Sequence, residues 1–222
     1  MSTETEFISE KVRLLSKFVK PYLTEKRYRH TISVANEVRS LGGIYLPDRL
    51  EDLQISALLH DITKKDDIAK QLQYCQNFDI ITENDDLLSK DTLHALTAAA
   101  LAERKFADYV NGDVLSGIRW HTTGHDGMSI FESLVYLADY IEETRVFEGS
   151  VRLRRYLYDR ISSGCDKYAV LYDSMIYSFN MTIEYLIKKD SSIDGNTVSA
   201  RNYFISQKNS LTDNRSLCNE KE

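Results

Sequence analysis

The chain has 222 residues, of which 42% are apolar and 28% charged, the balance of an ordinary globular protein. Its formal charge is −6 and it has no dense run of lysine and arginine, which argues against DNA or RNA as its main ligand. The first ten residues are acidic and lack the apolar centre of a signal peptide, and no apolar stretch approaches the roughly 20 residues that cross a bilayer. Cys75, Cys165 and Cys218 are widely separated, so we expect free thiols and a cytoplasmic protein.

Residues that break helices are scarce, with two prolines and nine glycines in the whole chain. This scarcity predicts an all-α fold, a single helical bundle with short connections. Apolar residues spaced by three and four positions predict the individual helices. These are expected over 5–20, 24–43, from after Asp48 to the His60–Asp61 pair, 66–76, 91–107, 112–121, 128–145 and 166–189.

Local signals set the ends of the second helix and the limits of the domain. Thr24 is the expected N-cap of the helix 24–43, and the pair Gly42–Gly43 is expected to stop it. We expect one domain over residues 1–205, with its functional core at 26–145 and packing helices at 148–205. Residues 206–222 are polar and are expected to form a flexible tail.

The helix 166–189 has the clearest apolar stripe, which we interpret as core packing and not as a ligand platform. The stripe consists of Tyr168, Tyr172, Met175, Ile176, Phe179, Ile183, Leu186 and Ile187.

One acidic residue lies inside an apolar helix. Asp139 stands in SLVYLADYIEE, with Val135, Leu137, Ala138 and Ile141 around it. Burying an unpaired carboxylate in such a setting is costly, so Asp139 needs a metal ion, another cation or a hydrogen-bond network. An aspartate with a purely structural partner is the alternative.

Two further segments carry candidate metal ligands. His60 and Asp61 follow the apolar run ISALL and therefore stand at the end of a helix with a buried body. Adjacent helical side chains point about 100° apart, so both reach one ion if it lies against the helix end. His30, in RYRHTISVANEV, fits either a metal site or a satisfied core histidine, and a solvated aspartate is the alternative for Asp61.

Taken together, two imidazoles and two carboxylates form a mixed nitrogen and oxygen ligand set that suits Fe, Mn, Co, Zn or Mg. Such an ion lowers the pKa of a water molecule and supplies hydroxide near neutral pH. His94, in KDTLHALTAAA, and His121, in IRWHTTG, are two more candidates. They suit either a second ion or hydrogen bonds to a substrate phosphate.

The order H…HD…H…H…D resembles that of the HD-domain phosphohydrolases, an all-α, metal-dependent superfamily. The segments ALLHDITK and HTTGHDGMSIFESLVYLADYIEETRVFEG, with a lone histidine in an alanine-rich helix between them, are similar to the YqeK-type symmetrical bis(5′-nucleosyl)-tetraphosphatases. The resemblance extends from Lys26 to Leu186, and HTTG…GMS and LADYIE..R are its most specific parts. It implies a hydrolase that cleaves diadenosine tetraphosphate to two ADP, by attack of a metal-activated water on a central phosphorus.

The resemblance also implies roles for individual residues. It implies an iron centre, with one or two ions, held by His30, His60, Asp61 and Asp139. It implies contacts to the substrate phosphates from Lys64, His94, His121, Thr122 and Arg145, and further substrate contacts from His30 and Asp139. The catalytic roles that it implies belong to Asp61, Lys64, His94 and His121.

The chemistry of two cations agrees with these roles. Lys64 lies three residues after Asp61 and can neutralise a phosphate oxygen, although a solvated lysine beside Lys65 is the alternative. Arg145 lies six residues after Asp139, nearly two turns along one predicted helix, and is therefore expected on the same face.

Three other polar residues in the same region are given no role. We interpret Glu142 and Glu143 as solvated, and His125 as a residue at a variable position and not as a ligand.

Other functions remain open from the sequence. One is an HD-type nucleotidase or phosphodiesterase that acts on another nucleotide, and another is a non-catalytic nucleotide-sensing protein. The four intact ligand positions argue against the sensor, and an aspartate inside an apolar helix argues against a purely structural scaffold. We expect a small dinucleoside polyphosphate as partner, with no nucleic acid and no membrane, and the sequence leaves a homodimer open.

Overall fold

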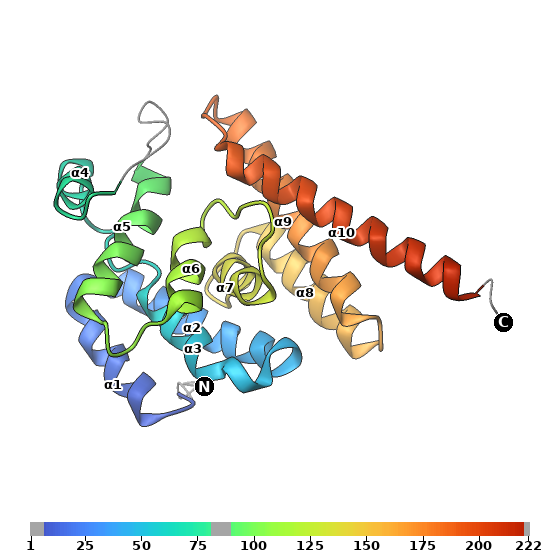
Figure 1. Cartoon of the computed structure of the whole chain (residues 1–222), viewed down its shortest axis with the longest axis horizontal. Helices are drawn as coiled ribbons and strands as arrows, with labels where there is room; N and C mark the ends of the chain where they lie inside the picture. Colours follow the sequence, from blue (N-terminus) through green and yellow to red (C-terminus); the bar gives the residue numbers. More distant parts are fainter. Residues whose placement is uncertain (1–6, 81–89, 220–222) are drawn as a thin grey trace. The chain divides into compact units, whose positions relative to one another are not determined.

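The computed structural model describes residues 7–80 and 90–219, with the side chains of residues 90, 91 and 212–219 left out. Within these ranges the chain forms helices and no strand, which confirms the predicted all-α fold (Figure 1). The chain divides into two compact units, one of Met1–Thr122 with Ser129–Thr144 and one of Thr123–Met128 with Arg145–Glu222. The predicted domain limits at 1–205 stay a prediction.

The first unit is built around one short helix that is buried over most of its length. Its helices are α1 (Glu10–Val19), α2 (Glu25–Tyr45), α3 (Leu50–Leu59), α4 (Ile68–Asn77), α5 (Lys90–Lys105), α6 (Gly112–Trp120) and α7 (Ile130–Ile141). Every residue of α3 from Leu53 to Leu59 is buried, and α1, α2, α5, α6 and α7 all contact it. A helix that is buried on all sides lies in the centre of a bundle, so the residues that follow it also lie deep in the unit.

The second helix begins where the sequence predicts but continues beyond its predicted end. The Thr24 side chain accepts a hydrogen bond from the backbone N–H of Arg27, which confirms the N-cap. The expected stop at Gly42–Gly43 is wrong, because α2 runs through both glycines to Tyr45. A Cβ atom at Gly42 would lie 2.7 Å from side-chain atoms of Leu50 and Leu53. Gly42 therefore permits close packing of α2 against the next segment and does not terminate the helix.

Helix α7 is shorter than predicted. Ser129 and Glu132 form a capping box at its start, and the helix ends at Ile141, with Glu142 as C-cap at a ψ of 156°. Residues 139 and 145 therefore do not share one continuous helix. Arg145 therefore does not lie on the helical face of Asp139, and this prediction is wrong.

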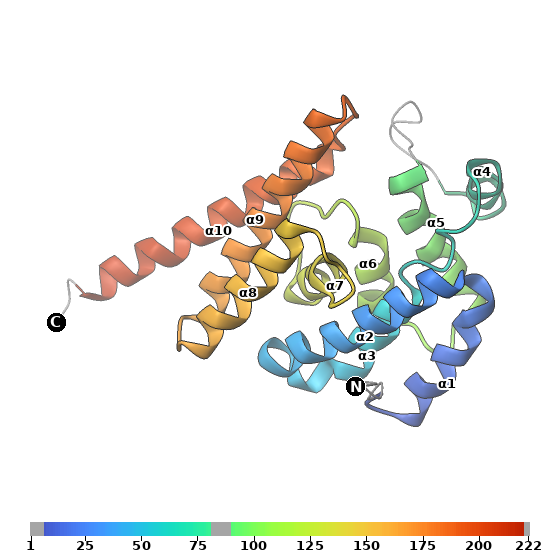
Figure 2. The ribbon, with the colours of Figure 1, turned by 180° about the vertical axis from the view of Figure 1, so that it is seen from behind.

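The second unit contains α8 (Glu148–Ser162), α9 (Lys167–Lys188) and α10 (Gly195–Asn219), which lie side by side in both views (Figure 2). In the predicted stripe of α9, Met175 and Phe179 are fully buried, but Tyr168 and Ile187 are exposed. Gly149, at the start of α8, lies against Met181. The residues of α9 after Met181 therefore extend beyond the first residue of α8, and α8 does not cover Ile187.

The final helix continues past residue 205, where the last packing helix was expected to end. No proline or glycine follows Gly195, so nothing in the sequence stops α10 before Asn219. The backbone of 206–219 is therefore helical, and the flexibility of 206–222 stays a prediction, with 220–222 outside the described residues.

The described residues include two of the three cysteines. Cys75 and Cys165 are free thiols, whereas the side chain of Cys218 lies outside the description. None of the described helices is both long enough and apolar enough to cross a membrane.

Candidate metal centre

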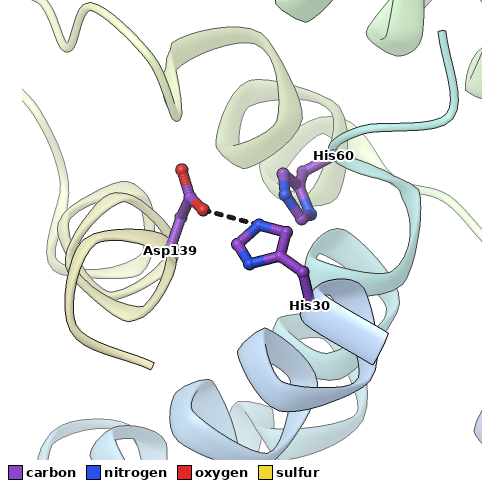
Figure 3. A group of neighbouring side chains, drawn as sticks. All are labelled: His30, His60 and Asp139. Carbon is purple, nitrogen blue, oxygen red and sulfur yellow. Dashed lines mark ion pairs between the residues drawn. The ribbon is translucent and has the colours of Figure 1, made fainter. Parts of the chain in front are cut away.

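The histidines and aspartates singled out from the sequence converge inside the first unit. His30 comes from α2, His60 and Asp61 follow α3, His94 lies on α5, His121 follows α6, and Asp139 lies on α7. Figure 3 shows His30, His60 and Asp139 pointing toward one another from three separate helices. Two groups of three ligand atoms each lie within 4.8 Å of one another, namely His30, His60 and Asp139, and His60, Asp61 and His121.

His60 and His121 are oriented by the same local device. Each is the C-cap of its helix, and its Nδ1 hydrogen-bonds the carbonyl three residues earlier, 2.6 Å to Ala57 and 2.7 Å to Ile118. A carbonyl only accepts, so Nδ1 is the donor and Nε2 keeps its lone pair. His60 is fully buried and its Nε2 makes no hydrogen bond. Both rings therefore present a metal-binding nitrogen to the centre of the cluster.

His30 lies between two carboxylates. Its Nδ1 is 3.0 Å from Glu142 Oε1, and its Nε2 is 2.9 Å from Asp139 Oδ1. A neutral imidazole has one N–H, so one of these two contacts places a lone pair against a carboxylate oxygen. Asp139 keeps 22% of its side chain exposed, so the cluster opens to solvent beside it.

Asp61 lies at the centre of the cluster and is buried. Its Oδ1 is 3.3 Å from His94 Nε2 and 3.7 Å from His121 Nε2, and its Oδ2 is 3.3 Å from His60 Nε2. Burial raises the pKa of this carboxyl, but the imidazoles of His60, His121 and His94 around it outweigh burial and hold the pKa of Asp61 well below its usual range. The group is a carboxylate at any pH near neutrality.

This donor set fits a divalent ion. The Nε2 lone pairs of His60 and His121 face the carboxylate oxygens of Asp61, so acceptors lie against acceptors. A cation bound between them would remove this repulsion. Two imidazole nitrogens with two carboxylates match the preferences of borderline and hard divalent metals. His30, His60, Asp61 and Asp139 are the residues that would hold such an ion.

The predicted phosphate contacts that belong to this unit lie on one side of the cluster. Lys64 Nζ is 3.2 Å from His94 Nδ1, and Thr122 Oγ1 is 3.1 Å from His121 Nε2. Burial lowers the pKa of His94 to about 4, against the opposing effect of Asp61, and burial also lowers the pKa of His121. Both rings are neutral at pH 7, and the ammonium of Lys64 is the positive charge that contacts His94.

Two residues of the cluster escaped the sequence analysis. Arg27, one turn before His30 on α2, donates from Nη1 to Asp61 Oδ2 at 2.7 Å. The interpretation of Glu142 as solvated is wrong, because this side chain is fully buried against His30, whereas Glu143 is exposed. The available signal was spacing, since each of the two lies three residues from a recognised ligand on the same helical segment.

Two residues considered from the sequence belong to the second unit. Arg145 starts that unit's main segment, and its carbonyl accepts a hydrogen bond from Arg154. Its contact with substrate stays a prediction. His125 lies at 2.6 Å from the Asp126 carbonyl through Nδ1 and belongs to neither group of metal-binding atoms.

Comparison with known proteins identifies the class. The family model of the HD domain matches residues 27–144, just over half of the chain and the segment that holds the whole cluster. The chain therefore belongs to the HD-domain family and is a hydrolase of that family.

Similar proteins narrow the class further. The chain is 32% identical over 192 residues to the symmetrical bis(5′-nucleosyl)-tetraphosphatase of Staphylococcus aureus, covering 85% of this chain and 91% of that protein. It is 30% identical over 195 residues to the protein of the same name from Bacillus subtilis, covering 85% and 94%. A crystal structure from Clostridium acetobutylicum, described as a predicted HD superfamily hydrolase involved in NAD metabolism, is similar with a TM-score of 0.76 and 34% identity. That match covers 88% of this chain and 97% of the other.

Proposed function

We propose that this chain hydrolyses diadenosine tetraphosphate symmetrically to two ADP, using a divalent ion held by His30, His60, Asp61 and Asp139. The observation that carries the proposal is the buried Nε2 of His60, which makes no hydrogen bond and points to a carboxylate oxygen of Asp61 at 3.3 Å. The names of the relatives from Staphylococcus aureus and Bacillus subtilis support the choice of substrate. Iron is the ion that we favour, with Mn, Co, Zn and Mg as alternatives and one or two ions per site.

When bound, the ion lowers the pKa of a water molecule and withdraws charge from phosphate oxygens. The protein's own residues then bind and orient the polyphosphate. The ammonium of Lys64 lies 3.2 Å from His94 Nδ1 and neutralises charge that develops on the attacked phosphate. The Thr122 hydroxyl and the neutral His94 and His121 rings supply hydrogen bonds to phosphate oxygens. Arg145 is proposed to bind a terminal phosphate.

The contact with Lys64 indicates which nitrogen of His94 carries the hydrogen atom. An ammonium only donates, and Lys64 Nζ lies nearer to Nδ1 of His94 (3.2 Å) than to Nε2 (3.4 Å), so we assign the N–H of His94 to Nε2. That N–H points to His121 Nε2 at 3.0 Å and to Asp61 Oδ1 at 3.3 Å, the heart of the cluster. His94 therefore offers its donor to a phosphate oxygen that enters there.

Product analysis in ¹⁸O-labelled water tests the proposal. Metal-loaded protein is incubated with diadenosine tetraphosphate, and the nucleotides are separated by anion exchange and weighed by mass spectrometry. We expect ADP as the sole product, with one ¹⁸O in half of the molecules, because water attacks one of two central phosphorus atoms. ATP together with AMP would exclude symmetrical cleavage. Faster turnover of ATP or deoxynucleoside monophosphates would favour the nucleotidase alternative, and no turnover of any of them the sensing protein.

A homodimer and a cytoplasmic location are compatible with this function and stay predictions.

A further inference from the structure

Among the described residues at the cluster, Glu142 is a buried carboxylate that the proposed reaction does not use. It is fully buried at the C-cap of α7, three residues after Asp139. Its Oε1 lies 3.0 Å from His30 Nδ1, and the two residues are separated by 112 positions in the sequence. The last turn of α7 therefore places one carboxylate on each nitrogen of the same imidazole.

The Glu142 carboxylate is held in place by its own chain segment. The backbone N–H of Thr144 donates to Oε2 and the Thr144 hydroxyl donates to Oε1, both at 2.6 Å. Two donors on one carboxyl group, together with its burial, fit an ionised Glu142 side chain. A buried carboxylate is tolerated only when its oxygens receive donors, so Glu142 needs a hydrogen atom on His30 Nδ1.

The two carboxylates beside His30 do not compete equally for its single N–H. Glu142 is sealed from solvent, whereas Asp139 is partly exposed and has water as another donor. An acceptor left without its donor is penalised most where water is excluded. The N–H of His30 therefore lies at Nδ1, and the lone pair lies at Nε2, toward Asp139 and the cluster.

We propose that Glu142 is a positioning residue, which fixes the tautomer and ring orientation of His30 so that Nε2 is presented as a metal ligand. The inference rests on the metal centre of the proposed function and adds a residue that acts through a ligand without contacting the ion. Thr144 holds the Glu142 carboxylate, and Glu142 in turn holds the His30 ring. Carboxylates that bind the distal nitrogen of a metal-binding histidine commonly change metal affinity by about 10- to 100-fold.

A neighbouring glutamate provides a matched control. Glu143 follows directly, is exposed, and loses the same charge when it is replaced by glutamine. Glu142→Gln keeps the size of the side chain but removes the charge that selects the Nδ1–H tautomer, and its amide can also turn an N–H toward the ring. We expect Glu142→Gln to weaken binding of Mn²⁺ by about 10- to 100-fold and Glu143→Gln to change it less than about twofold, measured by competition with a chromogenic chelator.

The tautomer itself is read in protein freed of metal by a chelator. Long-range ¹H–¹⁵N spectra of histidine-labelled protein distinguish the protonated nitrogen of each ring, and the His30→Asn variant assigns the His30 signals. We expect Nδ1–H for His30 in the wild type and in Glu143→Gln, and a mixture or Nε2–H in Glu142→Gln.

Three results would overturn the inference. They are an Nε2–H tautomer for His30 in the wild type, wild-type metal affinity in Glu142→Gln, and weakened affinity with an unchanged tautomer, which would indicate a purely structural C-cap. If Glu142→Gln fails to fold, the wild-type spectrum decides alone. Failure of the proposed function is recognised separately, because inability to cleave diadenosine tetraphosphate leaves the tautomer and the metal affinity unaffected.

Discussion

Replacing Lys64 by alanine separates a phosphate contact from a metal ligand. Lys64 is half-buried, and its ammonium lies 3.2 Å and 3.4 Å from the two nitrogens of His94. We expect Lys64→Ala to retain its metal and its thermal stability. Loss of one charged donor to the transition state typically costs about 3–4 kcal/mol of barrier, so we expect kcat to fall by about 10²- to 10³-fold.

The adjacent lysine is the control for this experiment. Lys65 is exposed, and its Nζ donates to the Pro21 carbonyl at 2.5 Å, so Lys65→Ala removes the same charge at the surface. We expect a change within about 0.5 kcal/mol in stability and little change in turnover. Steady-state release of ADP, elemental analysis and thermal melting are measured on all three proteins. Turnover of Lys64→Ala equal to that of Lys65→Ala would return Lys64 to a solvated lysine, and loss of metal would mean that it supports the ligands.

Other predictions concern the ligand Asp139, the titration of His94 and the packing of α2. Asp139→Ala should weaken metal binding by more than about tenfold, and retention of stoichiometric metal by elemental analysis would contradict its role as ligand. The pKa of His94 is about 4 in the folded chain against 6.5 for an ordinary histidine, so the unfolded chain binds more protons between these values. The free energy of unfolding of chelated protein should therefore fall by about 3 kcal/mol as the pH drops from 6.5 to 4, and His94→Gln should remove most of this fall in urea titrations. Gly43→Ala, at an exposed helical site with no atom within 4 Å, should stabilise the protein by about 0.8–1 kcal/mol. Gly42→Ala should instead be destabilising, because overpacking against Leu50 and Leu53 costs about 1–3 kcal/mol, and a destabilising Gly43→Ala would mean that α2 ends at the glycine pair.

Local patterns were sufficient for the helices and for most of the candidate ligands. The run ISALL predicts a buried helix, and a helix buried on every side carries His60 and Asp61 into the centre of the unit. Asp139 was recognisable because a carboxylate in an apolar helix demands a cation or a donor, and the structure places His30 Nε2 there. In both places, the apolar residues nearby in the sequence indicate that a polar side chain is buried and therefore needs a partner.

Positions that depend on a neighbouring helix were predicted wrongly. Gly42 looks like a helix stop along the sequence, yet Leu50 and Leu53 make it a packing site. Glu142 looks like a surface residue at the end of α7, yet the turn at ψ 156° and the Thr144 donors carry it inward to His30. In each case a residue of another helix decides the outcome, Leu53 for Gly42 and His30 for Glu142, and the sequence around Gly42 or Glu142 does not name that partner.

The sequence by itself thus determined the helical class, the positions of most helices and which side chains carry metal chemistry, because periodicity and burial cost are local properties. Only the tertiary structure decided how these side chains are oriented. Nδ1 of His60 and His121 is fixed by a carbonyl of the preceding helix, but Nδ1 of His30 is fixed by Glu142, 112 residues away. Packing of α2 against α7 sets that contact, and a tautomer set by packing has no signature in either segment alone.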